Sequence, residues 1–310
     1  MSALRCALAA MVLGVLASGP ALAQPTAPAA ALTARAEAGD PAAMRALGTA
    51  AFEAQKASLN RADIRRNEAE AIRWYKMAAD KGDAAAMHLL GVVYASRDAS
   101  APPPTPAPPV EAGQERFQVE IDDDDDRSED PNMQEAVRWF RMAADKGDAN
   151  GMFSLGTSYA DGSGLKPNGE EAIRWLSRAA ELGNTDAMVN LGFYYARGGT
   201  VAKDNAQSLR WYRRAADLGN PVAMFTLGVK AHEGEGVERS YAEAVRWERM
   251  AADKGYAAAM LNLGHYYARG EGVPKNEAES LRWYRLAASN GSREASERLS
   301  QRGIEVQPGR

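Results

Sequence analysis

Amide, aromatic and basic side chains recur as a set in the C-terminal half of the sequence. The set consists of Asn190, Phe193, Arg197, Asn262, His265 and Arg269. Offsets of three and seven residues within each triplet place its members on one face of a helix. Amides and guanidinium groups on such a face can hydrogen-bond the backbone of an extended peptide or its carboxylates. We predict that these residues form a peptide-binding surface; the alternative is a stripe that is merely solvated.

An apolar stripe runs beside the polar one. It comprises Phe153, Val189, Phe225 and Leu261. Such residues would supply side-chain pockets for a bound peptide, and Phe153 and Phe225 are the predicted contacts. The alternative is that the stripe packs against the neighbouring segment and contributes only to the core.

Metal and catalytic chemistry find little support in the sequence. The histidines His88, His232 and His265 do not share one spacing, whereas a metal site needs several ligands that converge on one ion; we expect them on the surface or in the binding groove. The run Asp122–Asp126 lacks the alternating ligands and the turn glycine of a calcium loop. The sequence contains neither a Gly-x-Ser-x-Gly elbow nor a phosphate loop. We therefore predict no enzyme activity, no cofactor and no metal.

Tryptophan spacing identifies the elements that must position these side chains. The tryptophans are Trp74, Trp139, Trp175, Trp211, Trp247 and Trp283. The last five stand 36 residues apart, and the first precedes them by 65. A fixed period of this length is typical of solenoids and propellers, whose repeats bury their apolar faces against one another. We predict that the tryptophans are core residues of a repeat array.

Each repeat is predicted to contain two helices. In the first helix of one repeat, Met188, Leu191 and Tyr195 share a face. In a second helix, Ala172 and Trp175 do the same. The polar stripe lies on first helices, so the fold class expected from the pattern is all-α.

Glycine recurs at two places in the repeat. One follows the central leucine of the first helix: Gly91, Gly156, Gly192, Gly228 and Gly264. Inside a helix glycine costs about 1 kcal/mol relative to alanine, so this recurrence predicts that a neighbouring helix approaches closely. The other lies in the turn between repeats and precedes a predicted N-cap. The predicted N-caps are Asp40, Asp83, Asp148, Asn184 and Asn220.

The period is interrupted twice, and one repeat carries unusual residues. Seven extra residues around Ala54–Arg66 predict a longer turn. A larger insert at about 98–130 has a proline-rich half, Ala101–Pro109, and an acidic half, and this composition predicts disorder. In the fifth repeat Ala231 replaces the usual tyrosine, and Glu248 replaces the usual aromatic residue. These two changes could open a notch that holds a carboxylate, or they could reflect drift.

Charge and the first residues bear on partners and location. The formal net charge of −4 argues against nucleic acid as the main partner. Residues 1–23 combine Arg5, a short apolar run and the small-x-small pattern Ala21-Leu22-Ala23, which predicts an export signal and a periplasmic or secreted protein. The apolar run is too short to span a bilayer, so no membrane insertion is expected after cleavage. Cys6 is the only cysteine, so we expect a mature protein without disulfides.

The repeat pattern resembles a known family. The string Ala-Met-x-x-Leu-Gly-x-x-Tyr, then Gly-x-Gly-Val, then Glu-Ala-x-Arg-Trp-Tyr-x-x-Ala-Ala-x-x-Gly is similar to the Sel1-like repeat, a relative of the tetratricopeptide repeat. The resemblance implies a right-handed superhelical α-solenoid of six antiparallel helix pairs plus a C-terminal half-repeat, with the first helices on the concave side. The implied organisation is a flexible N-terminus and lead-in helix at 24–38, an array at 39–301 that contains the disordered insert, and a tail at 302–310.

The resemblance also implies a function. Known members mostly act as adaptors or regulators that bind other proteins, so we expect a protein- or peptide-binding adaptor or regulator of the cell envelope that uses the concave face. One alternative is an envelope scaffold that binds peptidoglycan or exported polysaccharide. Another is a hydrolase of cell-wall peptides or β-lactams, but the cysteines of the family branch linked to β-lactams are missing here.

Overall fold

The computed structural model describes residues 29–97, 130–199 and 201–304. These ranges consist of helices joined by turns and contain no strand. The chain divides into two compact units, Met1–Leu182 and Gly183–Arg310. Helices α2 to α8 belong to the first unit, and helices α9 to α15 belong to the second.

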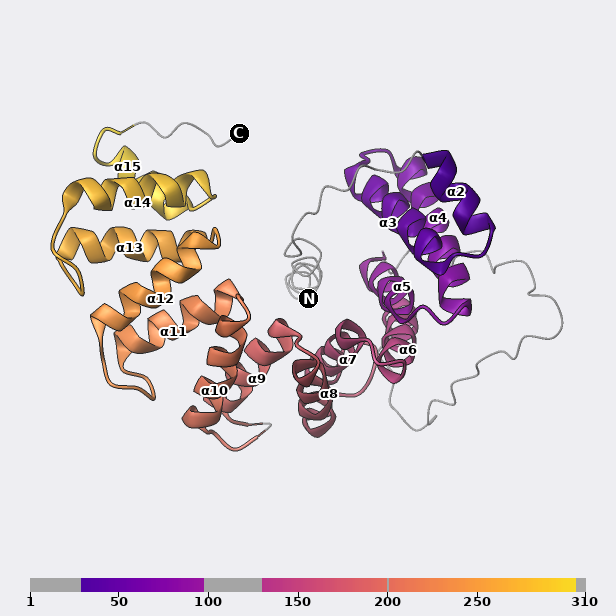
Figure 1. Cartoon of the computed structure of the whole chain (residues 1–310), viewed down its shortest axis with the longest axis horizontal. Helices are drawn as coiled ribbons and strands as arrows, with labels where there is room; N and C mark the ends of the chain where they lie inside the picture. Colours follow the sequence, from indigo (N-terminus) through magenta and orange to yellow (C-terminus); the bar gives the residue numbers. More distant parts are fainter. Residues whose placement is uncertain (1–28, 98–129, 200, 305–310) are drawn as a thin grey trace. The chain divides into compact units, whose positions relative to one another are not determined.

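The first unit contains a lead-in helix and three helix pairs. Its helices are α2 (Ala29–Glu37), α3 (Pro41–Ala57), α4 (Arg61–Asp80), α5 (Ala84–Ser96), α6 (Pro131–Asp145), α7 (Ala149–Asp161) and α8 (Gly169–Glu181). Each helix packs on the next one along the chain, and Figure 1 shows α3 with α4 and α5 with α6 lying side by side. An additional contact joins α5 to α7, which are first helices of neighbouring repeats.

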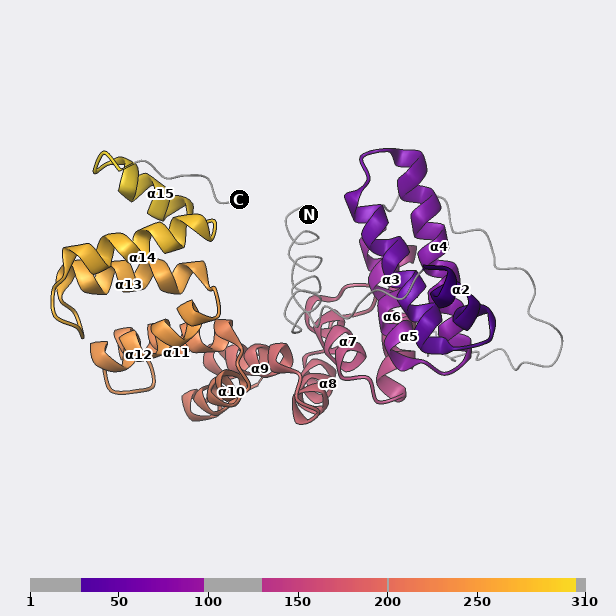
Figure 2. The same cartoon turned by 45° about the horizontal axis from the view of Figure 1, so that its top comes forward.

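The second unit continues the pattern with three pairs and a single last helix. Its helices are α9 (Thr185–Arg197), α10 (Asn205–Asp217), α11 (Pro221–Glu233), α12 (Tyr241–Asp253), α13 (Ala257–Arg269), α14 (Glu277–Ser289) and α15 (Arg293–Ser300). The turned view in Figure 2 again shows α11 beside α12 and α13 beside α14. The predicted all-α solenoid of helix pairs with a terminal half-repeat is therefore confirmed.

Local cap chemistry starts the first helix of each repeat. The N-caps are the predicted residues Asp40, Asp83, Asp148, Asn184 and Asn220. Each side-chain oxygen accepts a hydrogen bond from a backbone N–H of the first helical turn, which would otherwise lack a partner. The turn glycines before them adopt the positive φ that other residues avoid, for example 89° at Gly183. Helix α13 differs, because its N-cap residue Tyr256 makes no side-chain cap hydrogen bond.

Asn220 makes more contacts than a cap needs, and we expect its replacement to be costly. Its Oδ1 accepts from the N–H of Ala223 at 3.0 Å, and its Nδ2 donates to Thr185 Oγ1 and Asp186 Oδ1, both at 3.1 Å. Asn220→Ala should lower the free energy of unfolding by about 2 kcal/mol, measured by urea denaturation. Asn220→Asp keeps the cap acceptor but loses both donors and adds a charge beside Asp186. Equal stability of the alanine variant and the wild type would contradict this account.

Small residues permit close helix approach, as predicted. A Cβ atom placed on Gly264 would lie 2.4 Å from a ring carbon of Tyr284, and one on Gly91 would lie 2.5 Å from a ring carbon of Phe140. The glycine of one helix thus makes room for an aromatic ring from its paired helix. This packing explains why glycine recurs inside a helix despite its low helix propensity.

The tryptophans are less central to the core than predicted. Trp74, Trp139 and Trp175 are buried, but Trp211, Trp247 and Trp283 are only partly buried. The residue that follows each tryptophan is buried in every repeat: Tyr75, Phe140, Leu176, Tyr212, Glu248 and Tyr284. This position faces the helical glycine of the paired helix. The tryptophan comes one residue earlier in the chain and therefore points to a different side of the helix.

The extra residues of the first repeat lengthen its helices, so the predicted longer turn is wrong. Helix α3 has 17 residues and α4 has 20, compared with 13 in α7 and 13 in α8. Only residues 58–60 connect α3 to α4. Alanine and charged residues favour helix over turn, so the inserted sequence extends both partners.

Two sequence predictions fall largely outside the described residues. The export signal at 1–23 lies wholly outside them, and of the acidic insert at about 98–130 only Asp130, the N-cap of α6, is described. Among the described helices, none combines the length and the apolar character needed to cross a membrane.

Candidate functional site

The predicted binding stripe is closed in the first unit. Phe153 is 3% exposed, and Ser154 and Thr157 beside it are also buried. Helix α5 packs against α7 there, and Nε2 of the buried His88 lies 3.2 Å from Ser154 Oγ. Phe153 is therefore a core residue and unavailable to a ligand, and the expected surface or groove position of His88 is wrong.

The first triplet of the polar stripe, on α9, lies on an open surface. Asn190 is partly buried, whereas Phe193 and Arg197 are exposed, with 48% of the Phe193 side chain accessible. The Arg197 guanidinium lies 5.9 Å from the centre of the Phe193 ring. Phe225, from the apolar stripe, lies on α11, where its ring centre is 5.1 Å from that of Tyr256. Neither Phe193 nor Phe225 lines the pocket described next.

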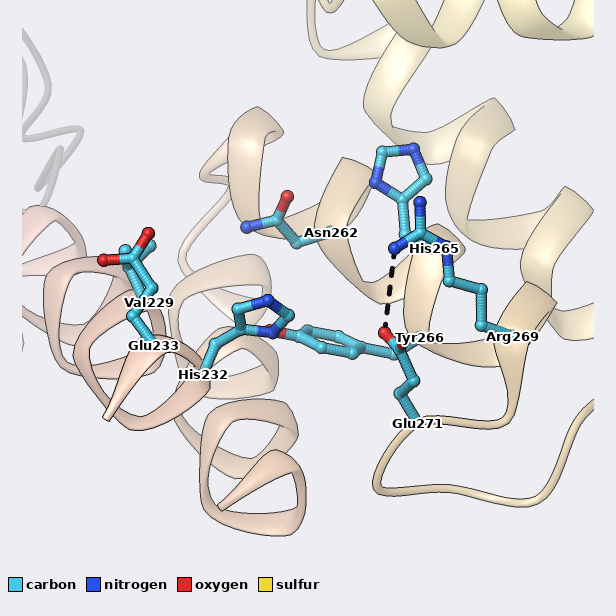
Figure 3. Close-up of a pocket in the computed structure, with 8 residues that line it drawn as sticks. All are labelled: Val229, His232, Glu233, Asn262, His265, Tyr266, Arg269 and Glu271. Carbon is cyan, nitrogen blue, oxygen red and sulfur yellow. Dashed lines mark hydrogen bonds and ion pairs between the residues drawn. The ribbon is translucent and has the colours of Figure 1, made fainter. Parts of the chain in front are cut away.

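The second triplet lines a pocket of about 230 Å³ between α11 and α13 (Figure 3). The lining residues are Val229, His232, Glu233, Asn262, His265, Tyr266, Arg269 and Glu271. Helix α11 supplies the first three, α13 supplies the next four, and Glu271 follows the end of α13. The structure thus brings Asn262, His265 and Arg269 together, as the shared helical face predicts, and adds His232, which was expected on the surface or in the groove, with Val229, Glu233, Tyr266 and Glu271.

One wall of the pocket combines an imidazole and a phenol. The hydroxyl of Tyr266 lies 3.1 Å from His232 Nδ1, and the His232 ring makes an edge contact with Tyr241 at 5.1 Å. Burial raises the pKa of Tyr266, and the nearby Glu248 carboxyl acts in the same direction. The phenol therefore keeps its proton and can donate it to Nδ1, which fixes the orientation of the imidazole.

The charged groups of the pocket lie at its outer end. Arg269 is 63% exposed, and its nearest carboxylate is Glu271 at 3.9 Å. Glu233 is exposed at the end of α11. Burial lowers the pKa of His265, and its Nε2 is buried without a hydrogen-bond partner among the described residues. His265 is therefore uncharged at neutral pH.

Glu248 lies behind the pocket, at the deeply buried position that follows a tryptophan. The residue has no exposed surface, so the open notch that was one alternative is not formed. Asn262 Nδ2 donates to Glu248 Oε1 at 2.9 Å, while Oε2 has no partner in the described part of the chain. Burial raises the pKa of this carboxyl from 4.5 to about 8. Asn262 thus connects a buried acid to the pocket.

The lining offers hydrogen-bond donors, hydrogen-bond acceptors and charged groups to a ligand. The pocket lining contains no Ser, Thr, Cys or Lys, the side chains that most often form covalent intermediates. In the described ranges, no group of three or more His, Cys, Asp or Glu side chains is placed to hold a metal ion. A pocket with donors, acceptors and charges from two consecutive repeats is a typical recognition site of a repeat protein.

Fold and pocket together define a helical-repeat protein of the solenoid class. The chain belongs to the Sel1 repeat family. The model of the Sel1 repeat matches residues 41–83, 127–148, 149–184, 185–220, 221–256 and 257–292. Sel1 repeat proteins are in general adaptors for protein–protein interaction.

Two solved structures support this assignment. The chain is similar to a protective antigen of uropathogenic Escherichia coli with the same repeat fold, at 25% identity and a TM-score of 0.63, over 91% of this chain and 54% of that one. It thus spans about half the length of that antigen. A Sel1 repeat protein from Oxalobacter formigenes is 28% identical with a TM-score of 0.62, over 81% of this chain and 88% of that one. No curated protein matches the chain.

Proposed function

We propose that this chain is a protein- or peptide-binding adaptor or regulator, and that the α11/α13 pocket is a contact site for its partner. The observation that carries the proposal is the convergence of side chains from two consecutive repeats on one pocket. Its volume of about 230 Å³ is below the roughly 300–1,000 Å³ of typical small-molecule sites. It therefore suits one or two side chains of a larger partner.

The pocket polarity also supports a peptide. Asn262, His232 and Tyr266 offer hydrogen-bonding groups, and Val229 offers an apolar surface. Peptide recognition commonly combines such groups, because the backbone needs hydrogen bonds and the side chains need contact area. The sequence pattern at 1–23, typical of an export signal, supports a periplasmic or secreted location within the same proposal.

A glycan-binding scaffold is the second candidate. One observation favours it, the exposed Phe193 with Arg197 beside its ring on α9. Exposed aromatic faces are the surfaces on which sugar rings stack. This candidate places the contact on α9 instead of the α11/α13 pocket, so the same experiment separates the two.

A capture experiment with matched variants tests the proposal. The pocket variant is His265→Ala/Arg269→Ala, and the control is Phe193→Ala/Arg197→Ala, which changes the equivalent positions of α9. We expect the immobilised pocket variant to lose at least 10-fold in partner captured from a cell-envelope extract, whereas the control retains it. Each variant is first checked for native helix content by circular dichroism. Undiminished capture by the pocket variant would refute the proposed site, and loss by the control alone, with reduced binding to peptidoglycan, would favour the glycan candidate.

A further inference from the structure

We propose that the α11/α13 pocket selects a basic side chain of its partner, a lysine ammonium or an arginine guanidinium. This inference rests on the proposed function, because it names the chemical group that the same pocket would bind. Three independent features of the pocket carry it: the direction of one amide, the two lining carboxylates, and the apolar and aromatic lining residues.

The amide of Asn262 presents an acceptor. Its Nδ2 donates to Glu248 Oε1 at 2.9 Å, behind the pocket. Its Oδ1 accepts no hydrogen bond from any described residue, and the side chain lines the pocket. An amide whose NH₂ group is already engaged recognises a ligand chiefly through its oxygen. A ligand group that donates N–H bonds therefore complements this wall.

Two lining residues of the pocket carry carboxylates. Glu233 comes from the end of α11 and Glu271 follows α13, whereas Glu248 behind Asn262 keeps its proton at neutral pH and adds no charge. Arg269 is the only lysine or arginine among the lining residues, and it extends towards Glu271 at 3.9 Å and is largely exposed. The pocket therefore offers more negative than positive charge to a ligand, and a cation gains from this field while an anion does not.

The remaining wall suits the rest of a basic side chain. Val229 can contact a methylene stem, and the aromatic rings of His232, from the same helix, and of Tyr266, from α13, also line the pocket (Figure 3). Lys and Arg side chains pair an apolar stem with a charged head, and aromatic faces attract such cations. The α9 surface lacks this arrangement, because Arg197 occupies the position of Glu233 in its repeat.

Nuclear magnetic resonance titration with small probes tests the inference directly. The probes are N-acetyl-arginine amide and N-acetyl-lysine amide, with N-acetyl-glutamate amide as the acidic control. We expect the basic probes to shift the side-chain amide signals of Asn262 and the ring signals of His232, and the acidic probe to leave them unchanged. Equal shifts with the acidic probe, or no shifts with either basic probe at tens of millimolar, would overturn the inference.

Charge-neutral variants supply the second arm. Glu233→Gln/Glu271→Gln should weaken binding of the arginine probe by roughly 10-fold, because two nearby carboxylates are removed. The matched control is Glu181→Gln/Glu238→Gln, which neutralises two exposed glutamates outside the pocket. Equal loss in both variants, or no loss in the pocket variant, would contradict the assignment. If capture by the pocket still holds but glutamate and not arginine displaces the captured partner, the inference fails while the proposed function stands.

Discussion

Replacing Glu248 with leucine is expected to raise the free energy of unfolding at neutral and alkaline pH. The wild type is expected to lose stability as the pH rises, and the leucine variant should lose much less. Glu248 is fully buried, and its Oε2 lacks a partner among the described residues. Its position holds an aromatic residue or leucine in the other repeats, for example Leu176, which is also fully buried. Burying an ionisable group with only one hydrogen bond is costly, whereas leucine at the same depth gains from burial.

The sign of the pH effect follows from the direction of the shift. The pKa of Glu248 is raised from 4.5 to about 8, so the folded state binds this proton more tightly than the unfolded state. Between these two values the unfolded chain releases the proton while the folded chain keeps it, and stability falls as the pH rises. At pH 7 the wild-type free energy of unfolding is lower than at pH 4 by on the order of 3 kcal/mol, and the decrease is complete above about pH 8.

Urea denaturation followed by circular dichroism at pH 5 and pH 8 measures this effect. The wild type should lose stability between the two values, and Glu248→Leu should lose much less. Glu248→Gln is the matched control, because it keeps the length of the side chain without its titration. A leucine variant that is less stable than the wild type at pH 8, or one with the same pH dependence, would contradict this account of the buried acid.

Gly264→Ala is expected to destabilise the protein by roughly 2–3 kcal/mol, although alanine is the better helix former. The new Cβ would lie 2.4 Å from one ring carbon of Tyr284 and 2.5 Å from the next. Tyr284 is itself buried, so the ring cannot move away without displacing α14 from α13. The gain of about 1 kcal/mol in helix propensity is smaller than the cost of this overlap.

A second glycine at the same repeat position provides a graded control. In Gly192→Ala the closest ring carbon of Tyr212 is 2.9 Å away, so the expected loss is smaller. Thermal unfolding of both variants beside the wild type gives the comparison. If the Gly264→Ala protein unfolds at a higher temperature than the wild type, the gain in helix propensity outweighs the overlap with Tyr284, and the two helices can move apart without a measurable cost.

Local chemistry explains why much of the fold could be predicted from the sequence. An N-cap such as Asp148 and a turn glycine such as Gly147 act within a few residues of themselves, so their pattern predicts helix boundaries directly. The length of α3 was missed because the inserted residues extend helices instead of a turn, and the 36-residue pattern contains no information about inserted residues.

The site was harder to predict because equivalent positions in different repeats meet different neighbours. Phe153 and Asn262 lie on adjacent stripes, but contact between α5 and α7 buries the first while the second lines a pocket. His232 was expected only on the surface or in the groove and was not assigned to the binding stripe, although it stands where other first helices have alanine, such as Ala196 and Ala268. That exception to a repeated small residue was a usable signal.

The burial of Glu248 also left a trace in the sequence. In each of the five remaining repeats the residue after the tryptophan is Tyr, Phe or Leu. This position is buried more consistently than the tryptophan itself. The hydrogen bond to Asn262 leaves no such trace, because it depends on how α12 packs against α13. The hydrogen-bond partner of Glu248 is therefore set by tertiary packing, which the repeat period alone does not specify.

Site-specific photo-crosslinking tests the central claim, that the α11/α13 pocket contacts the partner. A photoreactive phenylalanine analogue is placed at position 265, within the pocket, and at the equivalent position 193 on α9. We predict that irradiation in a cell-envelope extract joins a defined protein to the chain from position 265 and much less from position 193, and that excess N-acetyl-arginine amide suppresses this product. A product from position 193 with none from position 265 would contradict the claim.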